Sequence, residues 1–171
     1  LQAYRKFSPE MSMIGQKFFD EKWIDAEPRP GKEAGAFSHA AVPSVHPYLL
    51  MNFMGSTEDV KTLAHELGHG IHQTLAGKQG HLKSAMPLTL EETASVFGEM
   101  LTFREMLEKE QDLVARRAMI AAKVENMLNL SVDAVALFVF EQKVHQERRR
   151  KGELSSERIG DLWQEARKES L

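Results

Sequence analysis

Residues 57–77 restrict the fold of this chain more than any other segment. Apolar residues recur there with helical spacing and form one stripe, which consists of Val60, Ala64, Leu67, Ile71 and Leu75. His65, His69 and His72 lie on the opposite side of the same helix. The sequence therefore predicts an amphipathic helix over about 57–77 that packs its apolar face on a core and turns its histidines elsewhere.

Within this helix, residues 65–69 match the pattern H-E-x-x-H. Residues four apart lie on one face, so the imidazoles of His65 and His69 converge on one Zn²⁺ at ~2.1 Å each. Glu66 lies about 100° around the helix, where it reaches a water on the metal and takes its proton as a general base without being a ligand. The alternative is an ordinary helix with two hydrogen-bonded histidines.

Two glycines, Gly68 and Gly70, interrupt the same helix. Each costs about 1 kcal/mol relative to Ala inside a helix. We interpret them as positions where another segment packs very close to the helix backbone.

A third protein ligand has to come from outside this helix. The chain contains no cysteine, so His, Asp and Glu are the remaining ligand types. His72 lies about 10 Å along the helix axis from His65, which is too far to share one ion. Glu91, Glu92 and Glu99 on the next predicted helix are the candidates. Glu92 and Glu99 share a face of that helix, whereas Glu91 points about 100° away.

The rest of the sequence predicts a mainly α protein with a small antiparallel β element, an α+β fold. We expect a helix over 8–25, a short sheet within about 35–54, a helix over about 89–110, a helical region over 112–151 that has room for a break near 129–131, and a last helix from 155. The chain starts with Leu1 and its last segment still reads as helix, so we treat 1–171 as a single catalytic-core fragment of a longer protein.

Composition excludes several classes of partner. The net charge of −3 indicates neither nucleic acid nor a membrane surface. No run of about 18 apolar residues occurs and no signal peptide is visible, so we expect no membrane segment. Disulfides are excluded because cysteine is absent. We expect a cytoplasmic protein.

Several motifs together resemble one family. The run 65–73, followed by Glu92-Thr93-Ala94-Ser95 and Glu99, resembles the oligoendopeptidase F branch of the thimet oligopeptidase family of zinc metallopeptidases. Segments 30–37, 46–47 and 152–155 are similar to it as well. The resemblance implies a zincin-like core, in which the H-E-x-x-H helix packs beside a second ligand-bearing helix, and an enzyme that cuts short oligopeptides in a helix-walled channel.

The resemblance also implies the site residues. It makes His65, His69 and Glu92 the ligands of one Zn²⁺ per chain and Glu66 the general base. Glu99 is then a carboxylate that orients a zinc-bound imidazole, and His72 a neighbour of the cleft. For Glu92 the alternative is a capping box with the threonine at 89, and for Glu99 a partly exposed helix acid.

The family is about three times longer than this chain. Its oxyanion-stabilising His and Tyr residues lie after the matched stretch, whereas the two tyrosines here, Tyr4 and Tyr48, precede the motif. The isolated chain is thus expected to bind zinc but to be catalytically incomplete without the missing remainder of its parent.

For substrate binding we consider the predicted strand from Gly35 to Val42. The small residues Gly35 and Ala36 leave room for a peptide backbone to pair with the strand edge. The alternative is a strand that only caps the sheet. His39 and His46, which flank the proposed turn, are interpreted as surface or core histidines, and His81 as an exposed loop histidine.

Two other functions fit the motif. One is a catalytically incomplete zincin-like binding or scaffold module, which the intact Glu66 argues against. The other is a zinc aminopeptidase, which needs a site for a free amine that we do not find in the sequence.

Overall fold

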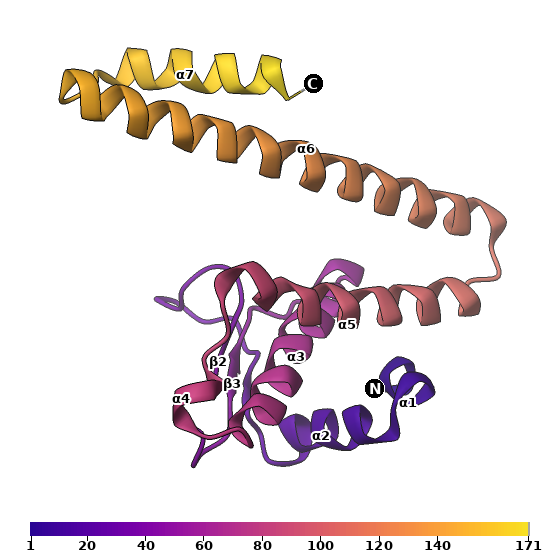
Figure 1. Ribbon diagram of the computed structural model, residues 1–171. Coiled ribbons are helices and arrows are strands. Elements are labelled where there is room, and N and C mark those ends of the chain that lie inside the picture. Colours follow the sequence, from indigo (N-terminus) through magenta and orange to yellow (C-terminus); the bar gives the residue numbers. More distant parts are fainter. Residues whose placement is uncertain (171) are drawn as a thin grey trace. The chain divides into compact units, whose positions relative to one another are not determined.

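The computed structural model describes residues 1–170 and divides the chain into two compact units (Figure 1). The first unit, Leu1–Glu110, contains α1 (Gln2–Phe7), α2 (Pro9–Asp20), β1 (Ile24–Asp25), β2 (Phe37–His39), β3 (Tyr48–Leu50), α3 (Thr57–Gly77), α4 (His81–Ser84) and α5 (Leu88–Lys109). The second unit begins at Gln111 and contains α6 (Leu113–Lys151) and α7 (Ser156–Glu169). The mainly α fold with one small sheet is confirmed. None of the described helices combines the length and the apolarity needed to cross a membrane.

The start of α3 is fixed by a reciprocal cap. The Ser56 hydroxyl accepts a hydrogen bond from the backbone N–H of Asp59 at 3.1 Å, and the Asp59 carboxylate accepts one from the Ser56 N–H at 2.9 Å. The charges of Glu58 and Asp59 also suit the positive end of the helix dipole. Because the cap sets where α3 begins, it also sets which way the later histidines of the helix point.

The core of the first unit forms where α3 meets α2 and the sheet. Its buried members are Tyr4, Ile14, Phe18, Leu49, Leu67 and Ile71. A Cβ on Gly70 would lie 2.7 Å from the Phe18 ring, so the close packing predicted at Gly70 is confirmed. The Tyr4 hydroxyl donates a hydrogen bond to the carbonyl oxygen of Ala64 at 2.7 Å, which ties α1 to α3.

On another side, α3 packs against α5, and the two helices lie side by side in Figure 1. A Cβ on Gly68 would lie 2.6 Å from the carbonyl oxygen of Ala94. From α5, Gly98 comes close to the Ala64 carbonyl, and a Cβ there would lie 2.9 Å from it. Glycines on both helices therefore allow a backbone-to-backbone approach, which confirms the close packing predicted at Gly68.

The sheet has three strands in the order β1-β3-β2. Pairing of β2 with β3 is antiparallel as predicted, while β1 joins β3 in parallel, so the sheet is mixed. The predicted helix over 8–25 was too long, because α2 ends at Asp20 and Lys22 adopts a left-handed φ of 58°. The chain then turns, and the Trp23 ring packs edge-on against Phe18.

Both predicted strands are shorter than the apolar runs that indicated them. After β2, Ala41 takes a left-handed φ of 54° and Pro43 has no N–H to donate, so pairing stops. A side-chain pair attaches β2 to α3: the Ser38 hydroxyl donates to Gln73 Oε1 at 2.8 Å, and Gln73 Nε2 donates to the Ser38 carbonyl at 3.3 Å. This places the edge strand beside the face of α3 that carries Gln73.

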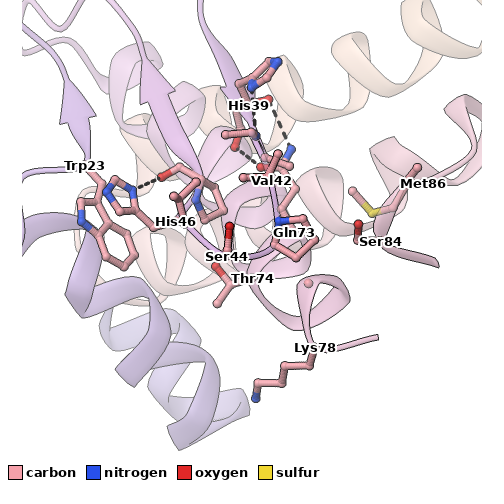
Figure 2. Close-up of a pocket in the computed structure, with 18 of the residues that line it drawn as sticks. Trp23, His39, Val42, Ser44, His46, Gln73, Thr74, Lys78, Ser84 and Met86 are labelled. Atoms are coloured by element: carbon pink, nitrogen blue, oxygen red, sulfur yellow. Dashed lines mark hydrogen bonds between the residues drawn. The ribbon is translucent and has the colours of Figure 1, made fainter. Parts of the chain in front are cut away.

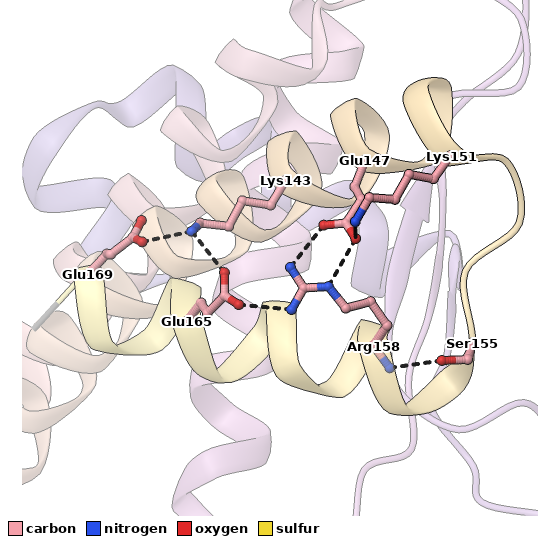
Figure 3. Close-up of polar contacts among 7 residues, drawn as sticks. All are labelled: Lys143, Glu147, Lys151, Ser155, Arg158, Glu165 and Glu169. Carbon is pink, nitrogen blue, oxygen red and sulfur yellow. Dashed lines mark hydrogen bonds and ion pairs between the residues drawn. The ribbon is translucent and has the colours of Figure 1, made fainter.

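The second unit is an antiparallel helix pair. Helix α6 is continuous, so the break expected near 129–131 is absent from it, and the Ser131 hydroxyl donates back to the Met127 carbonyl within the helix. Figure 3 shows Arg158 of α7 bridging Glu147 of α6 and Glu165 of α7. Phe140 and Trp163 add an edge-to-face ring contact in the same seam.

Candidate active site

Three side chains from two helices meet at one point of the first unit. His65 Nε2 lies 3.1 Å and His69 Nε2 lies 3.5 Å from the same oxygen, Oε2 of Glu92. One donor atom from each residue lies within 4.8 Å of the other two. His65 and His69 come from successive turns of α3, and Glu92 comes from the first turns of α5. The structure thus brings together the three residues that the sequence put forward as ligands.

The donor set fits a zinc ion. With bonds of about 2.0–2.2 Å and tetrahedral angles, donor atoms in a zinc site lie roughly 3.3–3.6 Å apart. The two distances to Glu92 are close to this range. Two imidazoles and one carboxylate also form a ligand set that leaves a fourth position open. The Glu92 side chain is 63% exposed, so this side of the donor set is in contact with solvent.

Glu66 is held differently from an ordinary surface carboxylate. It is buried, and its Oε2 atom has no hydrogen-bond partner among the described residues. Burial raises the pKa of Glu66, His65 lowers it, and the charge of Glu92 raises it. A buried oxygen without a hydrogen-bond partner is rare in native proteins. It indicates that a group from outside the described residues binds this oxygen in the working molecule.

Burial also affects His69. It lowers the pKa of His69, although the nearby Glu92 carboxylate acts in the opposite direction. A lowered pKa keeps the imidazole neutral, which is the form that binds metal. The other ring nitrogen, Nδ1, is buried without a partner among residues 1–170.

The other predicted site residues surround these three. Glu99 Oε2 lies 3.8 Å from His65 Nδ1, close enough to act through its charge but too far for a hydrogen bond. His72 has a buried Nδ1 without a partner in the described part of the chain. Glu91 is close enough to raise the pKa of His69, yet it is not among the three converging donors.

Glu92 does not form the capping box considered above. The N-cap of α5 is Pro87, with no side-chain cap, so the threonine at 89 already lies inside the helix. The Glu92 carboxylate instead accepts a hydrogen bond of 2.7 Å from the Ser95 hydroxyl. Ser95 is fully buried against α3, so this bond helps to orient the carboxylate toward the histidines.

A cavity of about 770 Å³ lies against α3; Gln73 of α3 and Glu91 of α5 line it, whereas His65, His69 and Glu92 are not part of its lining. Figure 2 shows Trp23 and His46 at one end of it and Met86 at the other, with Gln73 between them. Gln73 follows His69 by one helical turn, which places the cavity about 6 Å further along α3. Trp23 and His46 stack face to face, with ring centroids 4.0 Å apart.

Sequence reasoning missed this cavity. Its lining includes the residues from Ser38 to Pro47 and also His81. His39 and His46, which were interpreted as surface or core histidines, therefore line it. Gln73 carried the one signal that was available, because it lies on the same helix face as His69 at a spacing of four.

The predicted substrate residues lie outside the cavity lining. Gly35 adopts a φ of 90°, and a Cβ on it would meet no atom within 4 Å. Gly35 and Ala36 precede β2, which is an edge strand of the sheet. The space beside Gly35 is therefore open, and neither Gly35 nor Ala36 belongs to the three converging residues.

Comparison with known proteins assigns the chain to a family. The model of peptidase family M3 matches residues 6–171. The chain belongs to peptidase family M3. Among curated relatives, the chromosomal oligoendopeptidase F of Lactococcus lactis subsp. cremoris is 31% identical over 160 residues, which are 93% of this chain and 26% of that protein. Oligopeptidase PepF of Bacillus subtilis (strain 168) is 24% identical over 98% of this chain and 25% of its own length.

Solved structures show that the fold is shared with longer M3-type proteins. A Bacillus anthracis str. Ames structure described as an oligoendopeptidase F has a TM-score of 0.81 at 19% identity and covers 99% of this chain. PZ peptidase A, solved with an inhibitor, has a TM-score of 0.78 at 17% identity. The matches cover 30% and 29% of those chains. The present chain thus spans 25–30% of the length of these four relatives.

Proposed function

We propose that this chain is the metal-binding part of a cytoplasmic zinc-dependent endopeptidase that hydrolyses peptide bonds in oligopeptides. The observation that carries the proposal is the convergence of His65, His69 and Glu92 within 4.8 Å, next to the buried and unpartnered carboxylate oxygen of Glu66. Membership of peptidase family M3 and the oligoendopeptidase names of the relatives support peptide bonds as the target.

In this proposal His65, His69 and Glu92 hold the ion, with Ser95 and Glu99 orienting its ligands. Zn²⁺ bound there supplies Lewis-acid activation of water and of the substrate carbonyl. Glu66 accepts a proton from the attacking water at its carboxylate and later donates it to the leaving amine. The burial that raises the pKa of Glu66 favours this exchange, because the carboxyl then holds a proton more readily between the two steps.

The peptide is held along β2 in this proposal. The outer edge of β2 is unpaired within the described sheet, and an extended peptide can add to it by backbone hydrogen bonds that demand no particular side chain. The Ser38–Gln73 pair places this edge one helical turn from His69. Substrate side chains that point toward α3 then enter the cavity lined by Trp23 and His46.

The names of the relatives favour an endopeptidase over an aminopeptidase, because several of them are oligoendopeptidases. A scaffold module without catalysis does not require a buried carboxylate with an unpartnered oxygen at position 66.

The proposal is tested with Glu66→Gln and His65→Ala in the full-length parent peptidase. We expect Glu66→Gln to keep one zinc per chain and to lose hydrolysis of a fluorogenic peptide by 10²-fold or more, about the contribution of a general base. We expect His65→Ala to lose zinc. Near wild-type hydrolysis by Glu66→Gln, or unchanged zinc content in His65→Ala, contradicts the assignment.

A further inference from the structure

The ammonium group of Lys32 is buried inside the first unit, and only 2% of the side-chain surface is exposed. Its Nζ atom donates to the carbonyl oxygens of Asp25 at 2.9 Å, Glu27 at 3.0 Å and Met51 at 2.6 Å. It also lies 3.0 Å from Oδ1 of Asp25. Because an ammonium has three protons to donate, each of them has an acceptor here. Lysine is almost never buried to this degree unless it is paired in this way.

These bonds attach the connection between β1 and β2 to the end of β3. Asp25 is the last residue of β1, and Met51 directly follows β3. Since β1 and β3 are parallel, both strands end at the edge of the sheet where the Lys32 ammonium lies. Asn52, the next residue after Met51, adds a second link, because its side-chain amide donates to the Glu33 carbonyl at 2.9 Å.

The entry into β2 is held by side chains and not by a backbone ladder. Within residues 1–170, no backbone hydrogen bond outside the sheet involves residues 33–36. Gly31 and Gly35 both have a left-handed φ, of 80° and 90°. The Asn52 amide also reaches the Gly35 carbonyl, at 3.4 Å. Lys32 and Asn52 therefore supply the contacts that fix the path of the chain just before the edge strand.

Stability alone does not require a buried ammonium at position 32. Replacing a buried ion pair by apolar side chains of similar volume is often neutral or stabilising, whereas buried charges can restrict a chain to one conformation. Hydrogen bonds from Arg29, and then from Lys32, lower the pKa of the Asp25 carboxyl, so it remains ionised beside the ammonium. The use of Lys32 is therefore expected in the conformation that it fixes, which is the entry into β2.

We propose that Lys32 and Asn52 are positioning residues for peptide binding, because they hold β2 in the conformation that pairs with an extended substrate. The inference rests on the proposed function, in which a peptide adds to the outer edge of β2. An edge that is already ordered does not have to be ordered when the peptide binds, so less binding free energy is lost. Neither residue belongs to the three converging donors, so their effect is expected on KM and not on zinc.

The test uses Lys32→Met and Asn52→Asp in the full-length parent peptidase. Lys32→Met keeps most of the side-chain length and removes the ammonium, while Asn52→Asp keeps the shape and replaces the donor by an acceptor. The control is Arg29→Met, which removes the other cation bound to Asp25 from a side chain that is 53% exposed. KM and kcat for a fluorogenic peptide, zinc content, and hydrogen exchange of residues 33–40 by mass spectrometry are measured for each variant.

We expect Lys32→Met and Asn52→Asp to raise KM by about fivefold or more, because the edge then has to be ordered by the peptide. Exchange at residues 33–40 should be faster in both, while kcat stays within about twofold and zinc at one per chain. Arg29→Met should change KM by less than about twofold, because the Lys32 contacts with the three carbonyls remain.

Unchanged exchange at residues 33–40 overturns the proposal, as does faster exchange without a rise in KM. A fall in kcat at constant KM overturns it too, since the effect would then lie at the reacting atoms. If Lys32→Met does not fold, the same criteria are applied to Asn52→Asp, whose side chain is only half-buried. If the two variants differ, the one without an effect on KM is not a positioning residue.

The parent peptidase separates failure of this inference from failure of the proposed function. If the parent cleaves no peptide, the proposed function is wrong and the role of Lys32 and Asn52 in peptide binding is wrong with it. If the parent cleaves peptides and both variants keep its KM, only the role of these two residues is wrong.

Discussion

The backbone of Gly68 in α3 lies against the carbonyl of Ala94 in α5, where a Cβ on the glycine would come within 2.6 Å of the oxygen. This contact between backbones sets the spacing between α3, which carries His65 and His69, and α5, which carries Glu92. The distance between the donor atoms therefore depends on Gly68, which supplies no donor atom itself.

Gly68→Ala is expected to push α3 and α5 apart. Overpacking of this kind costs about 1–3 kcal/mol of stability, and we expect weaker zinc binding in chelator competition as the Glu92 oxygen moves away from the histidines. The control is Gly160→Ala on α7, where a Cβ meets no atom within 4 Å. There the better helix propensity of Ala should raise stability by up to about 1 kcal/mol. Unchanged zinc affinity in Gly68→Ala contradicts the prediction.

The three acids of α5 are expected to differ in their effect on zinc. Glu92→Ala should weaken binding most, because its Oε2 lies 3.1 Å and 3.5 Å from the two histidine nitrogens. Glu99→Ala should have an intermediate effect through His65, and Glu91→Ala the smallest. Chelator competition on the three variants measures the order, and Glu91→Ala as the most damaging change would refute the ligand set.

A bulky residue before β2 is expected to hinder peptide binding. Ala36→Val should raise KM for oligopeptides several-fold in the full-length enzyme and leave zinc content unchanged, because the branched side chain crowds the edge that a peptide would pair with. Ala34→Val, at an exposed position two residues earlier, is the control. A bound peptide analogue that leaves the outer edge of β2 in solvent would show that substrate binds elsewhere.

The helix pair of the second unit is expected to lose stability in acid. Hydrogen bonds and charges from Arg158 and Lys151 lower the pKa of Glu147 from 4.5 to about 2. Because the folded-state pKa is the lower one, the stabilisation is complete above about pH 4.5 and is lost as the pH falls toward 2.

Urea denaturation followed by Trp163 fluorescence, in a Trp23→Phe background, measures this effect. Between pH 4.5 and 2 the urea midpoint should fall less for Glu147→Gln than for the parent sequence, since the variant has no carboxylate to protonate. Glu141→Gln, an exposed position on the same helix, should follow the parent. Identical pH profiles for Glu147→Gln and the parent would contradict the prediction.

Helix α3 could be predicted because the evidence for it is local. The apolar stripe of α3, its Ser56 cap and the spacing of His65 and His69 all lie within about 20 consecutive residues. The role of Glu92 could not be predicted from local evidence alone, because the position of its carboxylate depends on the contact of α3 with α5. The glycines at 68 and 98 that permit this contact indicate close packing without indicating the partner segment.

Other features had no local signal. Strand β1 has two residues and depends on the turn at Lys22, where a lysine takes a conformation that glycine usually adopts. The cavity combines Trp23, the β2–β3 connection and the segment around Met86, which are distant in sequence. Such a combination is a property of the packed first unit and not of any one motif.

The hydrogen bond from Tyr4 to the Ala64 carbonyl has a consequence for how the chain can be shortened. The tyrosine ring is 1% exposed, and its hydroxyl lies against Gly98 of α5 as well as Ala64 of α3. A version that starts at Ser8 would leave a hole between the two helices and a buried carbonyl without a donor. A shortened piece that keeps this contact between α3 and α5 therefore has to begin before Tyr4, although 60 positions separate Tyr4 from Ala64.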